Sequence, residues 1–375
     1  MTLLDEDQRL KVELLTLGMA VAPSATEVLA GPDGNRPLTL AEYATTSGIA
    51  LRFGEGLWVN VPLREHNPNF VGETPFILEY EQGAFYIHSP RRSAPVTPIP
   101  VPAYYDRTNA KGESHLDYGV THTDRVRISP VEGCALACQF CDLPYEYRYR
   151  TKRTEGLLET VAVALDDSTL AARHVLISGG TPRPEDYEYE NEAYEAVCRG
   201  FPGVEVDIMM VPAEGLIDPA RLLAMGVHSL SINLEVYNET LAKRLMAGKV
   251  KVGSRDYYLS FIERAAGLFG PGRVRSLLLV GLETLEDTLC GVAALAERGC
   301  EPVLSPFRPD PSTPLRHHSP PSVDTLIEAY ERSAEIASRY GMRLGPSCIP
   351  CQHNTLTFPD DSGYYRHDRG VFGVV

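Results

Sequence analysis

The chain has 375 residues, of which 43% are hydrophobic and 23% are charged, and its formal net charge is −15. This composition is typical of a soluble globular protein, and no run approaches the roughly 18 consecutive apolar residues that a membrane helix needs. The acidic balance argues against a nucleic-acid partner, because the best basic cluster, residues 147–153, is short. Small-molecule ligands are therefore favoured. Without a basic segment followed by an apolar run at its start, the chain is expected to be cytoplasmic.

The first 115 residues have the texture of a small antiparallel β region. Short extended runs are separated by turn signals, and these runs are 49–54, 56–63, 76–81 and 84–89. The proline-dense stretch 89–107 then predicts an extended connector without a regular ladder. We expect residues 1–115 to form a β-rich N-terminal domain of unknown role that ends in a proline-rich connector.

After residue 115, strand and helix patterns alternate. Buried strands are expected at 126–130, 174–178, 204–211, 227–234, 274–282 and 300–305. A later helix begins at its cap, Ser322, and a last short strand is expected at 342–346. Continuous apolar strands between amphipathic helices predict a parallel sheet with right-handed crossovers. The expected fold is α/β, with a partial or nearly closed (β/α) barrel over residues 116–347 and a C-terminal tail, 348–375, near its mouth.

Three of the eight cysteines, Cys134, Cys138 and Cys141, share one CxxxCxxC loop directly after the first expected barrel strand. In such barrels the chemistry sits at the carboxyl ends of the strands. Disulfides fit poorly in a long chain without a secretion signal. A closed zinc site needs a fourth ligand that this loop lacks, whereas three thiolates suit a cubane iron cluster with one open iron. The loop favours the iron cluster, with zinc as the alternative.

The CxxxCxxC loop, with the aromatic Phe140 before its third cysteine, resembles the signature of the radical S-adenosylmethionine (SAM) superfamily. The resemblance implies that the three thiolates hold a 4Fe-4S cluster and that SAM chelates the fourth iron. It also implies that an electron from the cluster cleaves SAM to a 5′-deoxyadenosyl radical, which abstracts hydrogen from the substrate. An electron donor such as flavodoxin or ferredoxin is then an expected partner.

Further segments follow in an order similar to that of the biotin synthase and lipoyl synthase branch of the superfamily. SGGTP resembles the family's GGE-like motif, which implies SAM binding by Ser178, Gly179, Gly180 and Thr181; the alternative is an ordinary glycine-rich turn. The NLE triplet places Asn233 and Glu235 on one strand face. It resembles a segment that contacts the SAM ribose and the substrate, although a solvated strand end would also explain it.

Three later segments nominate single residues by the same resemblance. SRDYY nominates Arg255 for binding the SAM carboxylate. The alternative is that Arg255 is an exposed arginine at the start of a helix. LLLVGLE nominates Val280 and Gly281 for contact with adenine, and Glu283 is expected at the N-terminus of the next helix. Within 302–315, Arg308 is a candidate anion contact or a surface salt-bridging residue.

The tail segment SCIPCQHN contains two thiols and an imidazole. Cys348 and Cys351 are candidate catalytic residues, and the alternatives for them and His353 are an auxiliary iron–sulfur cluster, another metal or plain packing. Helical or strand patterns surround the remaining cysteines, which are expected to be small buried thiols: Cys198, Cys290 and Cys300.

We expect a radical SAM enzyme that acts on a small polar metabolite by rearrangement, elimination, or C–C or C–S bond formation. A peptide substrate, gripped by the N-terminal β region through edge addition, is the alternative within this class. A zinc-stabilised binding or regulatory protein is the alternative in a different class. No nucleic-acid or membrane partner is expected.

Overall fold

The structure is a computed structural model that describes residues 4–31, 48–360 and 362–365. Residue 361 and the last ten residues of the expected tail, 366–375, therefore lie outside the described part. The α-helices are α1 (Glu6–Leu17), α2 (Pro23–Leu29), α3 (Leu143–Glu146), α4 (Thr154–Leu165), α5 (Tyr187–Gly200), α6 (Pro219–Met225), α7 (Glu239–Leu245), α8 (Ala247–Val252), α9 (Arg255–Phe269), α10 (Leu285–Ala296), α11 (Val323–Arg339) and α12 (Ile349–Gln352). Among these, none is long and apolar enough to cross a membrane.

The described strands form two large sheets and one short pair. They are β1 (Ala20–Val21), β2 (Gly48–Phe53), β3 (Leu57–Pro62), β4 (Ile77–Glu81), β5 (Ala84–His88), β6 (Ser93–Pro98), β7 (Gly119–His122), β8 (Arg125–Ile128), β9 (Val131–Glu132), β10 (Arg150–Thr151), β11 (His174–Ser178), β12 (Glu205–Met209), β13 (Ser229–Ser231), β14 (Val274–Val280) and β15 (Glu301–Pro306).

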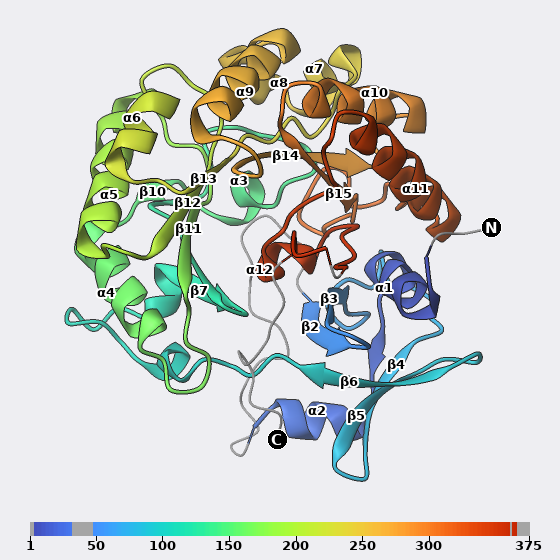
Figure 1. Cartoon of the computed structure of the whole chain (residues 1–375). Helices are drawn as coiled ribbons and strands as arrows, with labels where there is room; N and C mark the ends of the chain where they lie inside the picture. The colour runs from blue at the N-terminus through green and yellow to red at the C-terminus, as the bar shows by residue number, and fades with distance from the viewer. Residues whose placement is uncertain (1–3, 32–47, 361, 366–375) are drawn as a thin grey trace.

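The main sheet has the order β15-β14-β13-β12-β11-β8-β7. The six strands from β8 to β15 pair in parallel, and β7 pairs antiparallel with β8 at one edge. The sheet curls, and helices α4, α5, α6, α9, α10 and α11 cover its outer side (Figure 1). The expected α/β fold with a partial (β/α) barrel is confirmed.

The expected last strand, 342–346, is wrong in extent. Only a single parallel bridge, from Val303 to Gly345, continues the sheet there. Pro346 has no N–H to extend the ladder beyond that bridge. The helix expected before it is confirmed, because the Ser322 hydroxyl accepts a hydrogen bond from the Thr325 N–H at 3.1 Å.

The proline-dense stretch 89–107 contains a strand, so the expectation of a connector without a ladder was wrong. Residues 93–96 of β6 pair with β5, and residues 97–98 pair with β2. Each part of β6 therefore pairs on one side, and a proline can occupy a strand whose other edge needs no N–H. β6 joins the two hairpins of a six-stranded sheet with the order β1-β4-β5-β6-β2-β3.

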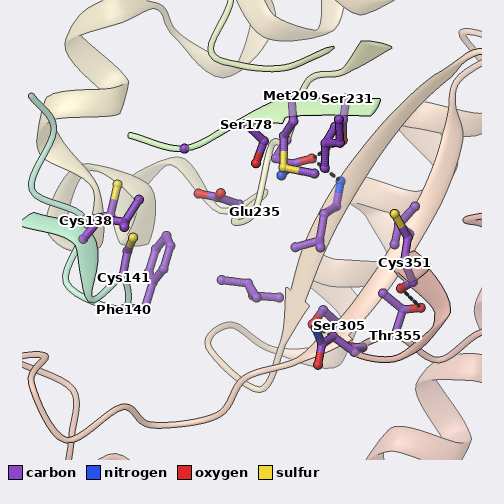
Figure 2. A pocket seen from close by; sticks show the side chains of 18 of the residues that line it. Cys138, Phe140, Cys141, Ser178, Met209, Ser231, Glu235, Ser305, Cys351 and Thr355 are labelled. Carbon is purple, nitrogen blue, oxygen red and sulfur yellow. Dashed lines mark hydrogen bonds between the residues drawn. The ribbon is translucent and has the colours of Figure 1, made fainter. Parts of the chain in front are cut away.

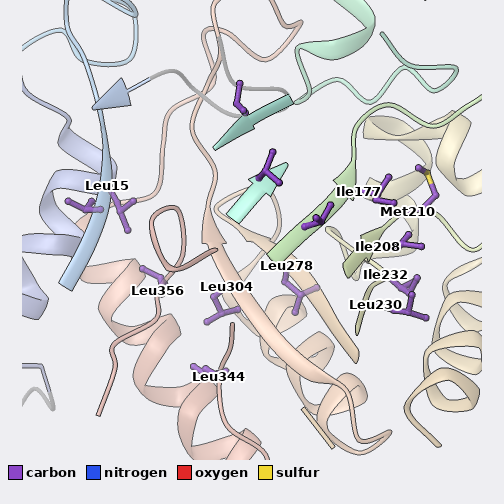
Figure 3. Packing of buried hydrophobic residues seen from close by; sticks show 14 of the residues in the cluster. Leu15, Ile177, Ile208, Met210, Leu230, Ile232, Leu278, Leu304, Leu344 and Leu356 are labelled. Carbon is purple, nitrogen blue, oxygen red and sulfur yellow. The ribbon is translucent and has the colours of Figure 1, made fainter. Parts of the chain in front are cut away.

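The hydrophobic core lies between the outer face of the main sheet and the helices. Alternate residues of the parallel strands point into it, among them Ile177, Ile208, Leu230, Leu278 and Leu304 (Figure 3). Leu15 of α1 and Leu356 of the tail belong to the same cluster. Burying one such leucine contributes about 1.5–3 kcal/mol, so the N-terminal helix and the tail are held firmly against the barrel.

The inner face of the main sheet is polar, which differs from the continuous apolar strands that the sequence suggested. Its buried polar residues include Arg125, Arg127, Asp207, Ser229 and Arg275. Each lies one position away from a core residue of the same strand, because side chains alternate between the two faces. The strands are therefore buried on both sides, and only one side is hydrophobic.

Candidate active site

A cavity of about 310 Å³ lies on the inner face of the main sheet. Cys138, Phe140 and Cys141 stand on one side of it, and Cys351 and Thr355 stand on the opposite side (Figure 2). The cavity therefore connects the CxxxCxxC loop with the tail, two segments that are far apart in the sequence.

The loop is fixed by the SGGTP turn after β11. The Cys134 Sγ accepts hydrogen bonds from the backbone N–H groups of Leu136, at 3.3 Å, and Thr181, at 3.2 Å. The Ala135 N–H donates to the Thr181 carbonyl oxygen at 2.9 Å. Both backbone groups of Thr181 are thus used to hold the loop. N–H donors directed at a sulfur are also a known means of tuning an iron–sulfur cluster.

Gly180 is required by this close approach of two backbones. A Cβ at Gly180 would lie 1.6 Å from the Gly133 carbonyl oxygen and 2.8 Å from the Cys134 Cα. No side chain can be placed there without moving the loop. The glycine therefore has a structural reason to be in the turn, in addition to any contact with a ligand.

The three thiols are suited to a metal cluster. Burial raises the pKa of Cys134, of Cys141 and of Cys138, the last to about 12, so each thiol stays protonated unless a cation compensates the thiolate charge. Coordination to a metal ion removes such protons outright. Three soft sulfur donors on one loop are the ligand set of a 4Fe-4S cluster with one open iron.

Zinc is a poorer fit to the same loop. In a tetrahedral site with Zn–S bonds of about 2.3 Å, the sulfurs lie roughly 3.8 Å apart. Among the described residues, the three Sγ atoms do not all lie within 4.8 Å of one another.

Most of the residues nominated for SAM line the cavity. Phe140, Ser178, Gly179, Thr181, Asn233 and Glu235 all do so. Asn233 and Glu235 follow β13 rather than forming part of it, and Glu235 has a left-handed backbone with φ of 67°. A parallel bridge to Leu278 of β14 holds Glu235 in this conformation.

Arg255 lies elsewhere. Its Nη2 is 3.0 Å from Glu239 Oε1, its guanidinium lies 4.7 Å from the centre of the Tyr237 ring, and it lines a second cavity of about 110 Å³. The structure does not bring it to the main cavity. Lys249 lines both cavities and is 2.9 Å from Glu235 Oε2, so it is the cation that this side of the main cavity presents.

Val280 and Gly281 are not brought to the main cavity either. Val280 is buried in the hydrophobic core, and Gly281, with φ of 105°, packs against Pro321. Because the strand alternates, the cavity-lining residues of β14 are Leu277 and Leu279 instead. Val280 is thus one residue out of phase with the cavity face, and Gly281 lies beyond the end of β14.

Glu283 has a different partner from the one expected. Its Oε2 accepts hydrogen bonds from the backbone N–H groups of Tyr237, at 2.9 Å, and Asn238, at 2.8 Å. Helix α10 begins two residues later and is capped by Thr284. Glu283 thus fixes the loop after β13, the same loop that carries Glu235.

Arg308 lines the cavity and is buried, so the interpretation as a surface salt bridge was wrong. Its Nη2 donates to Asn354 Oδ1 at 2.7 Å, and its Nη1 donates to the Asn60 carbonyl oxygen at 3.2 Å. Asn60 belongs to β3, so Arg308 joins the barrel to both the tail and the N-terminal sheet. Its role as an anion contact stays a prediction.

The tail places its two cysteines differently. Cys351 lines the cavity and accepts a hydrogen bond from the Arg125 Nη1, whereas Cys348 is buried behind it. The hydrogen bond from Cys348, together with the charges of Arg125 and Arg275, holds the pKa of Cys351 well below its usual range. His353 also lines the cavity, and its ring stacks on Trp58 with 5.5 Å between centroids.

The remaining cysteines are mixed. Cys300 is buried and Cys198 is half-buried, but Cys290 is exposed, so its expected burial was wrong. Helix α10 turns this position outward, on the face opposite its buried residues. A helical sequence pattern contains both a buried face and an exposed face. Which of its residues are buried depends on what packs against the helix.

Several cavity residues were missed by the sequence analysis: Arg125, Arg127, Lys249, Arg275 and Asp142. Arg125 and Arg127 could have been found, because charged residues at every second position of a buried strand indicate a polar inner face, whereas Arg275 shares its face of β14 with Leu277 and Leu279. Lys249 had no such signal, since it lies on the short helix α8. Burial beside Asp310 and Glu146 raises the pKa of Asp142 to about 7.

Comparison with known proteins gives one family. The model of the Radical SAM superfamily matches residues 128–290, a range that begins at the end of β8 and includes the three clustered cysteines. The bacteriochlorophyllide c C-7(1)-hydroxylase of Chlorobaculum limnaeum is 30% identical over 136 residues, which are 36% of this chain and 34% of that protein. The match thus spans about a third of the length of this curated relative.

Solved structures with a similar fold include two that are distant in sequence. A radical SAM methyltransferase from Sphaerobacter thermophilus has a TM-score of 0.47 and 16% identity over 75% of this chain and 80% of that one. The FeFe-hydrogenase maturase of Carboxydothermus hydrogenoformans has a TM-score of 0.43 and 17% identity over 58% and 51%.

Proposed function

We propose that this chain, whose residues 128–290 match the Radical SAM superfamily, is a radical SAM enzyme that removes a hydrogen atom from a small polar metabolite. The observation that carries this proposal is the single cavity that the three clustered cysteines share with Asn233, Glu235 and the polar inner face of the sheet. When bound, the cluster and SAM supply the 5′-deoxyadenosyl radical that this reaction needs.

The chain's own residues hold and enclose the reactants. Cys134, Cys138 and Cys141 are the ligands for the cluster, and the turn at Gly180 keeps them in place. Asn233 and Glu235 face the same space and offer an amide and a carboxylate for the hydroxyl groups of SAM. Leu277 and Leu279 provide an apolar wall on β14. Such a wall keeps water and stray hydrogen donors away from a reactive radical.

Of the two tail thiols, Cys351 is proposed to meet the substrate. It lines the cavity on the side opposite the cysteine loop (Figure 2). Cys348 is buried and forms a hydrogen bond with it. Cys348 is therefore a positioning residue. Among the described residues, the two thiols and His353 do not gather as three ligand atoms within 4.8 Å. This supports a single cluster rather than an auxiliary one.

The N-terminal domain is proposed to hold the tail over the cavity. The buried Lys11 Nζ donates to the carbonyl oxygens of Gln352, at 2.9 Å, and Thr357, at 2.6 Å. The Asn60 N–H donates to the His353 carbonyl oxygen at 2.9 Å. The division of the chain into an N-terminal domain (1–115), a barrel (116–347) and a tail (348–375) stays part of this proposal. The tail packs between the N-terminal domain and the barrel.

The reaction type remains within the classes expected from the sequence, and the name of the similar hydroxylase adds hydroxylation of a C–H bond to them. A one-electron donor of the flavodoxin or ferredoxin kind is the proposed partner. The net charge of −15 argues against a nucleic-acid partner.

The test is SAM cleavage by the full chain. Iron and sulfide reconstitution under anaerobic conditions is expected to give a brown protein, which after reduction releases 5′-deoxyadenosine and methionine from SAM. Cys138→Ala is expected to lose both the iron and the cleavage. A colourless protein that binds zinc but no iron, or a reduced iron protein that leaves SAM intact, contradicts the proposal.

A further inference from the structure

One end of the cavity, made by Arg125, Arg127 and Arg275, is strongly basic in a chain with a net charge of −15. We call these three residues the arginine end. Each is at most 8% exposed, and each stands at an inner-face position of β8 or β14. Buried charges are costly unless they are compensated, so this end is built to hold negative charge.

The partners of Arg125 and Arg275 leave guanidinium donors available. Arg275 Nη2 lies 3.2 Å from Asp207 Oδ2, and the Arg125 Nη1 donates to Cys351 Sγ. The Arg125 Nε is buried, and no described residue accepts its hydrogen bond. A guanidinium offers five N–H donors in a fixed fork, which matches two oxygens of a carboxylate or phosphate.

The charges of Arg125 and Arg275 also act on the Cys351 thiol, which lines the same cavity. The hydrogen bond from Cys348, and after it these two guanidinium charges, hold the pKa of Cys351 below its usual range, although burial raises it. The two arginines thus stabilise negative charge where the tail meets the cavity.

An apolar stretch separates the arginine end from the cysteine loop. Along β14 the cavity meets Arg275, then Leu277, then Leu279, toward the carboxyl end of the strand. Four residues of strand span about 13 Å. Leu176 and Met209, on the two strands β11 and β12, line the same cavity. The cavity is thus charged at one end, apolar along its middle and open to the cluster ligands at the other.

Resting on the proposed function, we propose that the arginine end binds an anionic oxygen group of the substrate, a carboxylate or a phosphate. The apolar body of the substrate then lies along Leu277 and Leu279, which places a carbon remote from the anion beside the cysteine loop. The substrate class is an amphipathic acid or phosphate ester in which the reacting carbon is separated from the anion by several bonds.

The experiment compares ligands that differ only in the charged group. Octanoate, octyl phosphate and octan-1-ol are titrated into the reconstituted full chain by calorimetry, with emission of the single tryptophan, Trp58, as a second readout, because Trp58 stacks on the cavity residue His353. At least one of the two anions is expected to bind about tenfold or more tightly than the alcohol. The tighter anion identifies the group as carboxylate or phosphate.

Variants then locate the anion. Arg125→Met is expected to weaken binding of that anion about tenfold without changing binding of the alcohol, and Arg125→Lys is expected to recover part of the loss. Arg343→Met, at the exposed Arg343–Asp360 pair, is the control and is expected to bind as the natural chain does. If thermal melting shows that Arg125→Met is unfolded, Arg127→Met decides in its place.

Equal binding of anions and alcohol, or unchanged anion binding in the folded arginine variant, overturns the proposal. The same preparations are assayed for 5′-deoxyadenosine without any octyl ligand. No preference for the anions over the alcohol in the natural chain, with intact SAM cleavage, rejects the arginine end alone, whereas absent cleavage in the natural chain rejects the proposed function.

Discussion

Lys249 Nζ lies 2.9 Å from Glu235 Oε2, and both side chains line the cavity that holds the cysteine loop. The pair is largely buried, with side-chain exposures of 7% and 18%. Glu235 raises the pKa of Cys138 and Lys249 lowers it, so the pair keeps the potential at this thiol close to neutral. The two residues are held by different elements: a bridge to β14 fixes Glu235, and helix α8 carries Lys249.

Lys249→Met is expected to destabilise the fold by about 3 kcal/mol, because it leaves the Glu235 carboxylate buried without its partner. The double variant Lys249→Met with Glu235→Gln is expected to recover much of this loss. Urea unfolding measures both. Arg339→Met, which breaks the exposed pair with Glu335, is the control and is expected to cost less than about 1 kcal/mol. If the loss of unfolding free energy in the double variant equals the sum of the losses in the two single variants, the pairing is contradicted.

Gly180→Ala is expected to reduce iron loading sharply, because the new Cβ collides with the Gly133 carbonyl and displaces the cysteine loop. The measurement is iron per chain after reconstitution, together with the melting temperature. Gly267→Ala, in α9 with nothing within 4 Å of its Cβ, is the matched control. It is expected to be stabilised by roughly 0.5–1 kcal/mol and to load iron normally. Normal loading in both variants refutes the role of Gly180.

Cys351→Ser is expected to keep about four irons per chain, because the proposed function has one 4Fe-4S cluster, held by Cys134, Cys138 and Cys141. Cys134→Ser, at a cluster ligand, is the comparison and is expected to lose most of the iron. About eight irons in the natural chain that fall to about four in Cys351→Ser would instead establish an auxiliary cluster.

Glu190 is expected to make stability fall as the pH rises. Burial raises its pKa to about 8 in the folded chain, whereas an unfolded glutamate releases its proton near pH 4.5. Between these values the folded state binds more protons, so the free energy of unfolding decreases with rising pH. Glu190→Gln removes this term and is expected to gain on the order of 2 kcal/mol relative to the natural chain between pH 5 and pH 8.

Urea unfolding at the two pH values measures this gain. Glu192→Gln, at an exposed position of the same helix, is the matched control for the substitution. A constant difference between Glu190→Gln and the natural chain at both pH values shows that Glu190 is not the titrating group.

Arg255→Ala is expected to change the affinity for SAM by less than about threefold, because Arg255 pairs with Glu239 outside the main cavity. Equilibrium dialysis of the reconstituted protein with labelled SAM measures this. A loss of about tenfold or more, roughly 1.4 kcal/mol, would restore the role in carboxylate binding that the sequence resemblance implied.

Local patterns in the sequence determined the parts of this protein that depend on neighbouring residues. The CxxxCxxC loop, the SGGTP turn and the alternation of strands with helices could be read directly, because ligand spacing, turn chemistry and helical period are local properties. Val280 shows the limit of such patterns: the strand was found, but the face that meets the cavity was assigned one residue out of phase.

The tertiary structure alone decided which distant residues share the cavity. Arg125 and Cys351 are 226 positions apart, yet they are in contact, because β8 forms the inner wall on which the tail is packed. The sequence pattern identified the strands as buried, but it did not show that their inner faces are charged. Curling of the sheet brings Arg125, Arg127 and Arg275 into the same cavity as the three cysteines, and no local pattern specifies that arrangement.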